Sequence, residues 1–398
     1  MYWWDRTGTL MWAEGTKLYD AGVLKATGAA NIADMVSFGS SSSPTLIVAE
    51  VLNGGHTLHT WSTAAYATLV GTSIPNVTKL MVRFGRLLGT VEAANPSRIY
   101  WCDVDDATQW GGSWGEGGFI DVAAGQDGAI VDWIDVEGIL YILKQRGIYR
   151  IVGYDAATYE VEKVTDIQNP KVNTIADCGK GTLYVCEYGV LPLGRGAGDN
   201  LDLTHPIETE FRAAVAAGTA SAVYSADLGC YVVVTGATTA YVSNIPNRPD
   251  VWTKFVMPLV AERIYSGNGL WVSLTGTGRG IYKYSHTATT DNTGAAVGFT
   301  PVFKTGNWDL EEQLKLKNLR FLQGDLNGGE SATATVKVYE EGSGTESISQ
   351  ALAANAENRI KCNRNFRRAA LEITYSSLTG PVYFGGAELL VTPKGDVA

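Results

Sequence analysis

A short β-hairpin pattern recurs along most of this chain and limits its possible folds more than any other feature. Each copy has a short apolar, β-branched or aromatic run after a turn residue, and a second such run a few residues later. The paired runs are residues 10–12 with 17–19, 45–48 with 58–61, 86–88 with 98–101, 139–142 with 148–151, 183–185 with 190–193, 230–233 with 240–242, and 270–272 with 281–284.

The spacing of these hairpins predicts a β-propeller. Turn residues precede the copies about every 40 to 50 residues, which is the period of a four-stranded propeller blade. These turn residues are Gly8, Pro44, Gly85, Gly138, Gly181, Gly229 and Gly269. Because no helices separate the hairpins, each small sheet can bury its faces only against neighbouring sheets. We therefore expect an all-β chain with six to seven four-stranded blades over residues 1–299.

One segment, residues 206–217, has the pattern of an α-helix. Thr204 is a candidate N-cap, and Pro206 falls in the first turn, where its missing N–H costs nothing. Ile207, Phe211 and Val215 recur at helical spacing. We expect a short helical insertion in one blade.

The pattern changes near residue 300. Strand-like runs separated by polar, glycine-bearing loops predict a small C-terminal β-sandwich over residues 300–398. The runs are residues 303–310, 314–322, 333–339, 369–375 and 382–391. Residues 1–299 carry 20 basic and 29 acidic side chains, against 11 and 12 in residues 300–398, so the acidity belongs to the predicted propeller.

Charge and cysteine content exclude several classes of protein. The net charge of −10 lacks the basic footprint of a protein that grips a phosphate backbone. The first residues lack a secretory signal, and no apolar run reaches the 18 residues of a membrane span, so we expect synthesis in a cytosol and no membrane partner. Five scattered cysteines without a C-x-x-C pair predict reduced thiols, with no metal site and no cofactor.

Two acidic clusters raise the alternative of a propeller-type glycoside hydrolase or polysaccharide lyase. Such an enzyme needs two carboxylates roughly 5 to 10 Å apart across a sugar. The candidates are Asp103, Asp106, Asp132 and Asp135. Both clusters adjoin turns, where aspartate commonly accepts backbone hydrogen bonds, and we favour that role. We therefore expect no catalytic residues and no enzyme.

Two further patterns suggest surfaces. The 11 tryptophans and 19 tyrosines could line the face of a carbohydrate-binding adhesin, although packing between blades explains them better. One basic cluster is a candidate partner-contact patch or a charged strand edge that resists pairing. It comprises Arg359, Lys361, Arg364, Arg367 and Arg368.

Three stretches resemble propeller proteins of tailed-bacteriophage virions, in particular the tail nozzle or tail-stabilisation proteins of short-tailed phages. The first is RIYWCD at 98–103, continuing to Trp110 and followed by residues 127–131 and 138–151. The second runs through residues 174–179, 182–185 and 189–190 to 203–208. The third is KTGNWDL at 304–310, leading into residues 316–321.

The resemblance implies a non-catalytic structural component of a virion, located in the tail or neck and made in the cytoplasm of a bacterial host. It implies a homo-oligomeric ring, which we expect to be a hexamer, connected to adaptor, tail hub or fibre proteins. Such a ring would line or close the DNA channel, and phage DNA would pass through it without specific binding during genome ejection. An acidic wall suits that passage, because like charges keep DNA from sticking.

Overall fold

A computed structural model describes residues 1–4, 6–39, 44–51, 58–63, 65–111, 117–153, 158–167, 169–179, 181–193, 202–204, 207–243, 251–275, 280–284, 302–304, 316–327, 333–340, 346–353, 357–366, 369–376 and 383–394. The chain divides into two compact units. The first comprises Met1–Tyr231 with Ile264–Trp271, and the second comprises Val232–Arg263 with Val272–Ala398.

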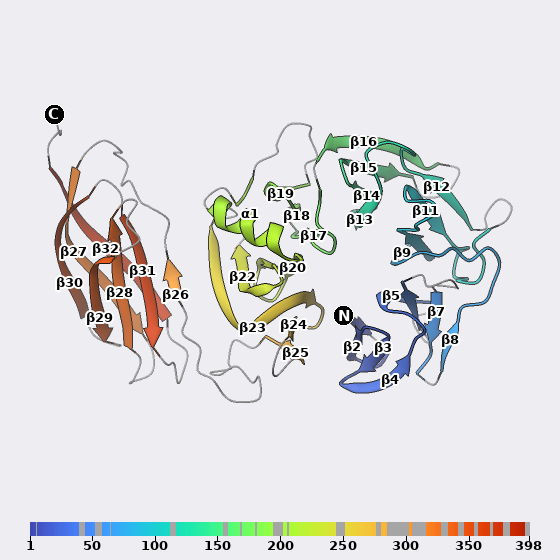
Figure 1. Cartoon of the computed structure of the whole chain (residues 1–398), viewed down its shortest axis with the longest axis horizontal. Coiled ribbons are helices and arrows are strands. Elements are labelled where there is room, and N and C mark those ends of the chain that lie inside the picture. Colours follow the sequence, from blue (N-terminus) through green and yellow to red (C-terminus); the bar gives the residue numbers. More distant parts are fainter. Residues whose placement is uncertain are drawn as a thin grey trace. The chain divides into compact units, whose positions relative to one another are not determined.

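The first unit consists of small antiparallel sheets whose strands follow one another in chain order. Figure 1 shows β5, β9 and β13 on the inner side of their sheets, and β8, β12 and β16 on the outer side. The first four-stranded sheet has β1 (Tyr2–Trp4), β2 (Thr9–Glu14), β3 (Lys17–Asp20) and β4 (Val23–Thr27), and the second has β5 (Ile32–Phe38), β6 (Thr45–Glu50), β7 (Leu58–Trp61) and β8 (Tyr66–Thr68). The third has β9 (Lys79–Arg83), β10 (Arg86–Thr90), β11 (Arg98–Trp101) and β12 (Gly118–Asp121). The fourth has β13 (Ile130–Val136), β14 (Ile139–Lys144), β15 (Gly147–Val152) and β16 (Glu160–Asp166). A three-stranded sheet follows, with β17 (Ala176–Asp177), β18 (Thr182–Cys186) and β19 (Gly189–Pro192).

A further sheet has its strands in the order β20 to β25. They are β20 (Ser221–Ser225), β21 (Cys230–Val234), β22 (Ala237–Ser243), β23 (Trp252–Ser266), β24 (Leu270–Thr275) and β25 (Gly280–Lys283). The predicted hairpins fall on adjacent strands throughout this sheet and the preceding ones. For example, β6 pairs with β7 through Leu46 and Trp61, and β14 pairs with β15 through Ile142 and Tyr149. The all-β prediction is confirmed for the described residues.

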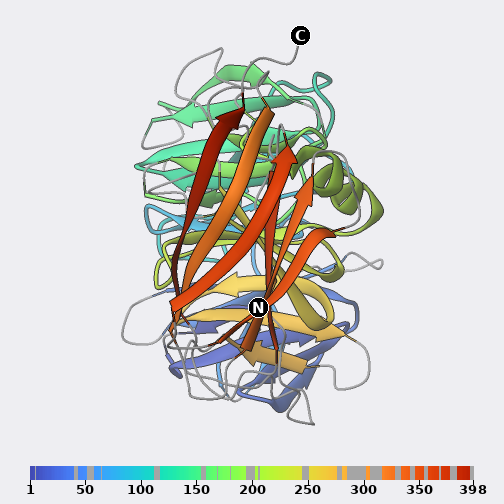
Figure 2. The same ribbon diagram turned by 90° about the vertical axis from the view of Figure 1, so that its left-hand side faces the viewer.

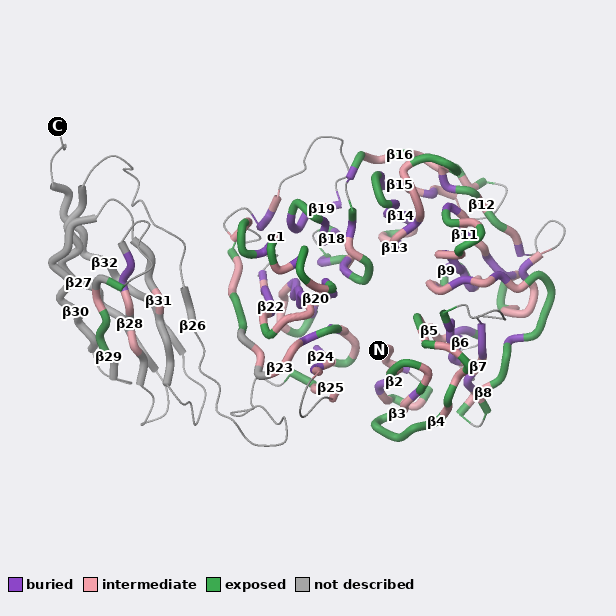
Figure 3. Tube along the Cα trace, viewed as in Figure 1, coloured by how far each residue is buried: buried purple, intermediate pink, exposed green. Residues whose placement is uncertain are grey.

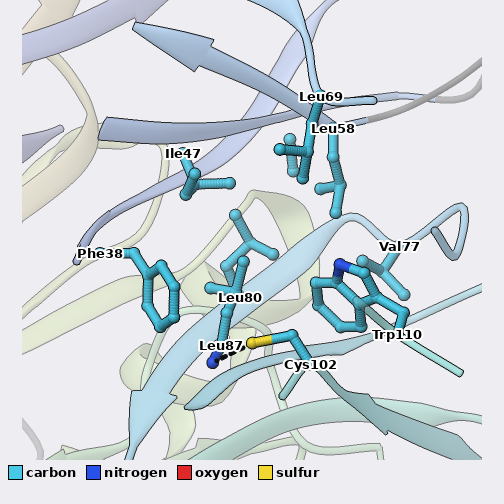
Figure 4. Close-up of a cluster of buried hydrophobic side chains, with 10 residues drawn as sticks. Phe38, Ile47, Leu58, Leu69, Val77, Leu80, Leu87, Cys102 and Trp110 are labelled. Atoms are coloured by element: carbon cyan, nitrogen blue, oxygen red, sulfur yellow. Dashed lines mark hydrogen bonds between the residues drawn. The ribbon is translucent and has the colours of Figure 1, made fainter. Parts of the chain in front are cut away.

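The core of the first unit lies between its successive sheets, because the middle strands of these sheets are apolar on both faces. Buried stretches, purple in Figure 3, run through β6, β14 and β18. Figure 4 shows one such cluster, in which Leu58 of β7 and Leu69, just after β8, pack with Leu80 and Leu87 of the third sheet and with Trp110 from the segment between β11 and β12. Equivalent clusters join the first sheet to the second, the third to the fourth, and the fourth to the fifth. Small antiparallel sheets that pack face to face in chain order, with their first strands on the inner side, have the arrangement of blades in a β-propeller.

The single helix of the described residues, α1 (Glu208–Ala217), confirms the helix expected over 206–217. Phe211 and Val215 are buried, as their spacing predicts. The predicted N-cap is wrong: Ile207 occupies that position without a side-chain cap, because the Thr204 hydroxyl is bonded to Asp202 at 2.5 Å instead. The acidic residues of the first turn, Glu208 and Glu210, complement the helix dipole.

Within the second unit, two sheets follow residue 301, and their strands are the long orange to dark red arrows of Figure 2. One has the order β26-β31-β28-β29 and the other β30-β27-β32. The strands are β26 (Val302–Lys304), β27 (Leu316–Asn327), β28 (Thr333–Glu340), β29 (Glu346–Ala353), β30 (Glu357–Phe366), β31 (Ala369–Ser376) and β32 (Tyr383–Lys394). Two of them, β29 and β30, are absent from the sequence prediction. The predicted boundary between residues 299 and 300 lies outside the described residues.

Candidate functional site

The first strands of the sheets are joined to one another by a circuit of hydrogen bonds and one ion pair that closes on itself. Two of its bonds join Ser37 N to Tyr2 Oη at 3.1 Å and Trp3 N to Tyr265 Oη at 2.8 Å, so that β1 connects both onward to β5 and back to β23. The remaining links are Leu80 N to Asp34 Oδ2 (2.9 Å), Lys79 Nζ to Asp132 Oδ1 (2.7 Å), Asn173 N to Asp132 Oδ2 (2.6 Å), Ala222 N to Asn173 O (2.9 Å) and Ile264 N to Ser221 Oγ (3.3 Å). All these residues belong to the first unit. We call this set the inner circuit.

Two aspartates of the inner circuit occupy the same place in a repeated motif. Asp34 follows Ile32 by two residues and Asp132 follows Ile130 by two, and the strand register shifts at both places. Each carboxylate accepts the N–H of the next residue and a second N–H from the following sheet or its leading loop. Burial raises the pKa of Asp34, while Lys79 and the two N–H donors oppose that shift.

Both candidate acids on β13 are occupied by ion pairs. Asp132 is buried and lies 2.7 Å from Lys79 Nζ. Asp135 lies 2.5 Å from Arg83 Nε and accepts the N–H of Gly138 at 3.0 Å. These contacts give both carboxylates a role in joining β9 to β13.

The candidate acids after β11 organise a turn. Asp103 accepts the N–H of Val104 at 2.7 Å, and Arg86 Nη1 lies 3.6 Å from its carboxylate. Asp106 accepts both the N–H and the hydroxyl of Thr108, and these bonds hold its pKa below the ordinary value. Both aspartates therefore accept hydrogen bonds within the turn, which is the role that we favoured for them from the sequence.

The structure brings the two acidic clusters to opposite sides of one hairpin. Arg83 and Arg86 face each other at the end of the β9–β10 pair, and the first binds Asp135 while the second lies near Asp103. Between these arginines, Phe84 and Gly85 form the turn.

This turn exposes apolar surface that the sequence analysis missed. Phe84 has a φ of 50° and Gly85 a φ of 70°, both in the left-handed region. The Phe84 ring is 47% exposed, and Val82 and Val104 are 39% and 49% exposed. We call these three side chains the Phe84 knob. The sequence contains one sign of this surface: Phe84 precedes the turn glycine Gly85, at a position where Asn or Asp is usual.

A buried polar cluster also escaped the sequence analysis. Glu50 accepts hydrogen bonds from Tyr66 Oη at 2.6 Å and from Ala30 N at 2.9 Å, and His59 Nε2 lies 3.6 Å from it. The His59 ring stacks on Tyr66. His56, Ser113, His205 and His286 lie outside the described residues.

The part of the chain that the structure describes has no disulfide and no group of side chains placed to bind a metal ion. Cys102, Cys178 and Cys186 are buried and unpaired, and burial raises the pKa of Cys102 to about 12. No group of three His, Cys, Asp or Glu side chains is placed to hold a metal ion there. Nor does any helix among these residues have the length and apolar content to span a membrane.

The basic cluster is only partly described. Arg359, Lys361 and Arg364 lie on β30, opposite Gln323, Phe321 and Leu319 of β27. Strand β30 is at the end of its three-stranded sheet. Arg367 and Arg368 lie outside the described residues.

Comparisons with known proteins give only low similarity. No family model and no curated protein sequence matches the chain. A streptogramin B lyase structure has 10% identity and a TM-score of 0.44, covering 69% of this chain and 88% of the lyase. Kluyveromyces lactis Hsv2 has 14% identity and a TM-score of 0.40 over 64% of this chain and 75% of its own. The dihydro-heme d1 dehydrogenase NirN, in complex with DHE, has 11% identity and a TM-score of 0.43 over 66% and 57%.

Proposed function

We propose that this protein is a structural component of a tailed-phage virion, a ring-forming nozzle or neck protein that lines or closes the DNA channel and connects adjacent tail proteins. The observation that carries this proposal is the inner circuit. Its polar side chains, including the candidate acid Asp132, are used to join sheet to sheet. Sheets joined in this way form a rigid structure that can bear mechanical load. The sequence resemblance to tail nozzle proteins also supports a structural role in the virion.

The proposal includes seven blades and a C-terminal sandwich. The inner circuit supports seven, since it runs through β1, β5, β9, β13, the Asn173 segment, β20 and the end of β23 before returning to β1. In this reading β23 serves two blades, because its 15 residues are long enough for an outer strand and the next inner strand. The four-stranded and three-stranded sheets after residue 301 support the sandwich.

The acidic balance of the first 299 residues supports passage of DNA. With 20 basic and 29 acidic side chains, this part of the chain repels a phosphate backbone. DNA would therefore slide along such a channel without the counterion release that drives tight binding. Localisation in the virion, and the partners named above, belong to the same proposal.

The two alternatives have less support. A propeller glycoside hydrolase or lyase needs a pair of available carboxylates, whereas Asp132 and Asp135 bind Lys79 and Arg83. A carbohydrate-binding adhesin would show exposed tryptophans on a concave face. Each tryptophan whose burial the structure describes is buried or half-buried.

The protein content of purified particles tests the proposal. Particles from the lysate in which the chain is made are banded by density, and each fraction is analysed by mass spectrometry beside the soluble fraction. We expect the chain to co-purify with particles in a fixed ratio to the major capsid protein. A chain found only in the soluble fraction would contradict the proposal and would make glycan hydrolysis the next assay.

A further inference from the structure

Two neighbouring turns of the third sheet leave the apolar side chains Phe84 and Val104 exposed. A two-residue hairpin turn with positive φ at both positions favours Asn-Gly. Among the described residues, two other turns of this kind have Ala21-Gly22, with φ values of 46° and 89°, and Glu137-Gly138, with 52° and 79°. At the β9–β10 turn the first position is Phe84 instead. Phe84 is a large aromatic side chain that is 47% exposed at this turn, so it is a candidate anchor for a binding partner.

The second turn lies directly against the first. Asp105 N donates to Gly85 O at 2.7 Å, which holds Val104 beside the Phe84 turn. A Cβ atom added to Gly85 would lie 3.3 Å from a Val104 methyl. On the other side, the Phe84 ring is adjacent to the Gly138 turn and lies 4.4 Å from the guanidinium carbon of Arg83. The Phe84 knob is therefore a fixed feature held by three turns.

Acidic side chains surround the knob. The two flanking turns and the adjoining strand end carry the acids Asp103, Asp105, Asp106, Asp135 and Glu137. The two arginines of the hairpin, Arg83 and Arg86, leave this region with a net charge of −3. An apolar centre with a charged rim is the usual anatomy of a protein–protein interface. Its complement is an apolar surface bordered by basic residues.

We infer that the Phe84 knob binds the basic edge strand β30 of a second copy of this chain. Charge complementarity carries the choice of occupant, because Arg359, Lys361 and Arg364 lie on this edge strand at three positions within six residues. Two different surfaces that meet in this way form a heterologous contact, and repetition of such a contact gives a closed ring when the rotation from one copy to the next is a whole fraction of a full turn. The inference rests on the ring of the proposed function and specifies its contact surface.

Sedimentation velocity on the full-length chain tests the inference. We expect the wild-type chain to associate as its concentration rises, and added salt to weaken that association, because exposed charges are screened. Phe84→Asn should abolish association while keeping the chain as stable as wild type, since Asn suits the turn. Val70→Asn is the matched control: Val70 is 79% exposed and is not one of the three side chains of the knob, so its loss should change nothing.

A mixing experiment identifies the partner surface. The double variant Arg359→Glu/Lys361→Glu should be monomeric on its own. An equimolar mixture of this variant with Phe84→Asn should form one-to-one dimers that do not extend, because each partner keeps a different intact surface. A mixture that stays monomeric would contradict β30 as the partner surface.

Other outcomes separate this inference from the proposed function. A wild-type chain that is monomeric at every concentration in low salt would overturn the contact, as would a Phe84→Asn chain that associates like wild type. Particle content is measured independently, so a chain that is monomeric but present in particles would remove the contact and leave the virion role standing. A chain that associates in solution but is absent from particles would contradict the virion role and leave the contact between copies standing.

Discussion

At the scale of single residues, buried and half-buried charges in this protein bind across sheet boundaries and turns. Asp127 is an example. Its carboxylate lies 2.7 Å from Lys163 Nζ and accepts a hydrogen bond from Tyr149 Oη at 2.5 Å. Its φ of 53° is in the left-handed region, which aspartate and asparagine both tolerate. Lys163 and Tyr149 together hold the pKa of Asp127 below its ordinary value.

Asp127→Asn should lower stability in a pH-dependent way. A depressed carboxyl pKa stabilises the folded state above the unfolded pKa of about 4, and that contribution is lost as the pH falls through the lower folded pKa. We expect the variant to lose roughly 1–2 kcal/mol of unfolding free energy at pH 7. The difference should disappear well below pH 4.

Urea denaturation of both proteins across this pH range measures the effect. Asp166→Asn is the control, because Asp166 also contacts Lys163 but its side chain is 84% exposed. The control should be close to wild type throughout. A deficit for Asp127→Asn that is the same at acidic and neutral pH would show that the ion pair is not its cause.

At the scale of elements, the repeated aspartate of the inner strands is the device that joins one sheet to the next. Asp132→Ala should cost about 3–5 kcal/mol of unfolding free energy. The loss is large because Lys79 Nζ and Asn173 N both lose their carboxylate acceptor. Asp103→Ala, at a half-exposed turn, should cost less than about 1 kcal/mol.

Equilibrium denaturation of the two variants gives the comparison. Equal, small losses would contradict the role of the inner circuit in holding the sheets together. Because the two substitutions remove the same chemical group, the difference between them isolates what burial and the bridging contacts contribute.

The sequence predicted the middle strands of each sheet better than the inner ones. Runs such as 139–142 are continuously apolar because both faces are buried, and they stand out. The inner strands β5 and β13 contain Asp34 and Asp132 and shift register there, so their alternation is broken. Strand β30 was missed because its alternation is obscured by charge and amide side chains.

The candidate site was predicted only in part, and for a related reason. The sequence pattern identified both acidic clusters but did not show that they lie beside the same hairpin. The arginines that contact them, Arg83 and Arg86, come from the β9–β10 hairpin and are distant from Asp135 and Asp103 in the sequence. The pairing partners of a carboxylate are set by tertiary packing. The exposed Phe84 was likewise hidden, because a lone aromatic in a β-rich sequence is usually part of the core.

At the scale of the whole first unit, we expect closure between β1 and β23 to contribute strongly to stability. Trp4 is fully buried and the neighbouring Trp3 N–H binds Tyr265 Oη. Deleting residues 1–4 removes this contact and the Trp4 side chain, and should cost more than the 3–5 kcal/mol typical of losing one buried tryptophan. Tyr265→Phe should cost only about 1 kcal/mol.

Thermal unfolding measures this series, with Tyr284→Phe as a control at a side chain that is 49% exposed. We expect the unfolding temperature to fall slightly for Tyr265→Phe and steeply for the deletion, with the control unchanged. A deletion as stable as the full chain would show that the inner circuit does not need to be closed.

Immunogold electron microscopy shows whether this chain is built into the virion, with an antibody to the chain applied to particles from the lysate in which it is made. We predict gold concentrated at the tail or neck of the particles. Particles without label, in a lysate that contains the chain in soluble form, would contradict a structural role in the virion.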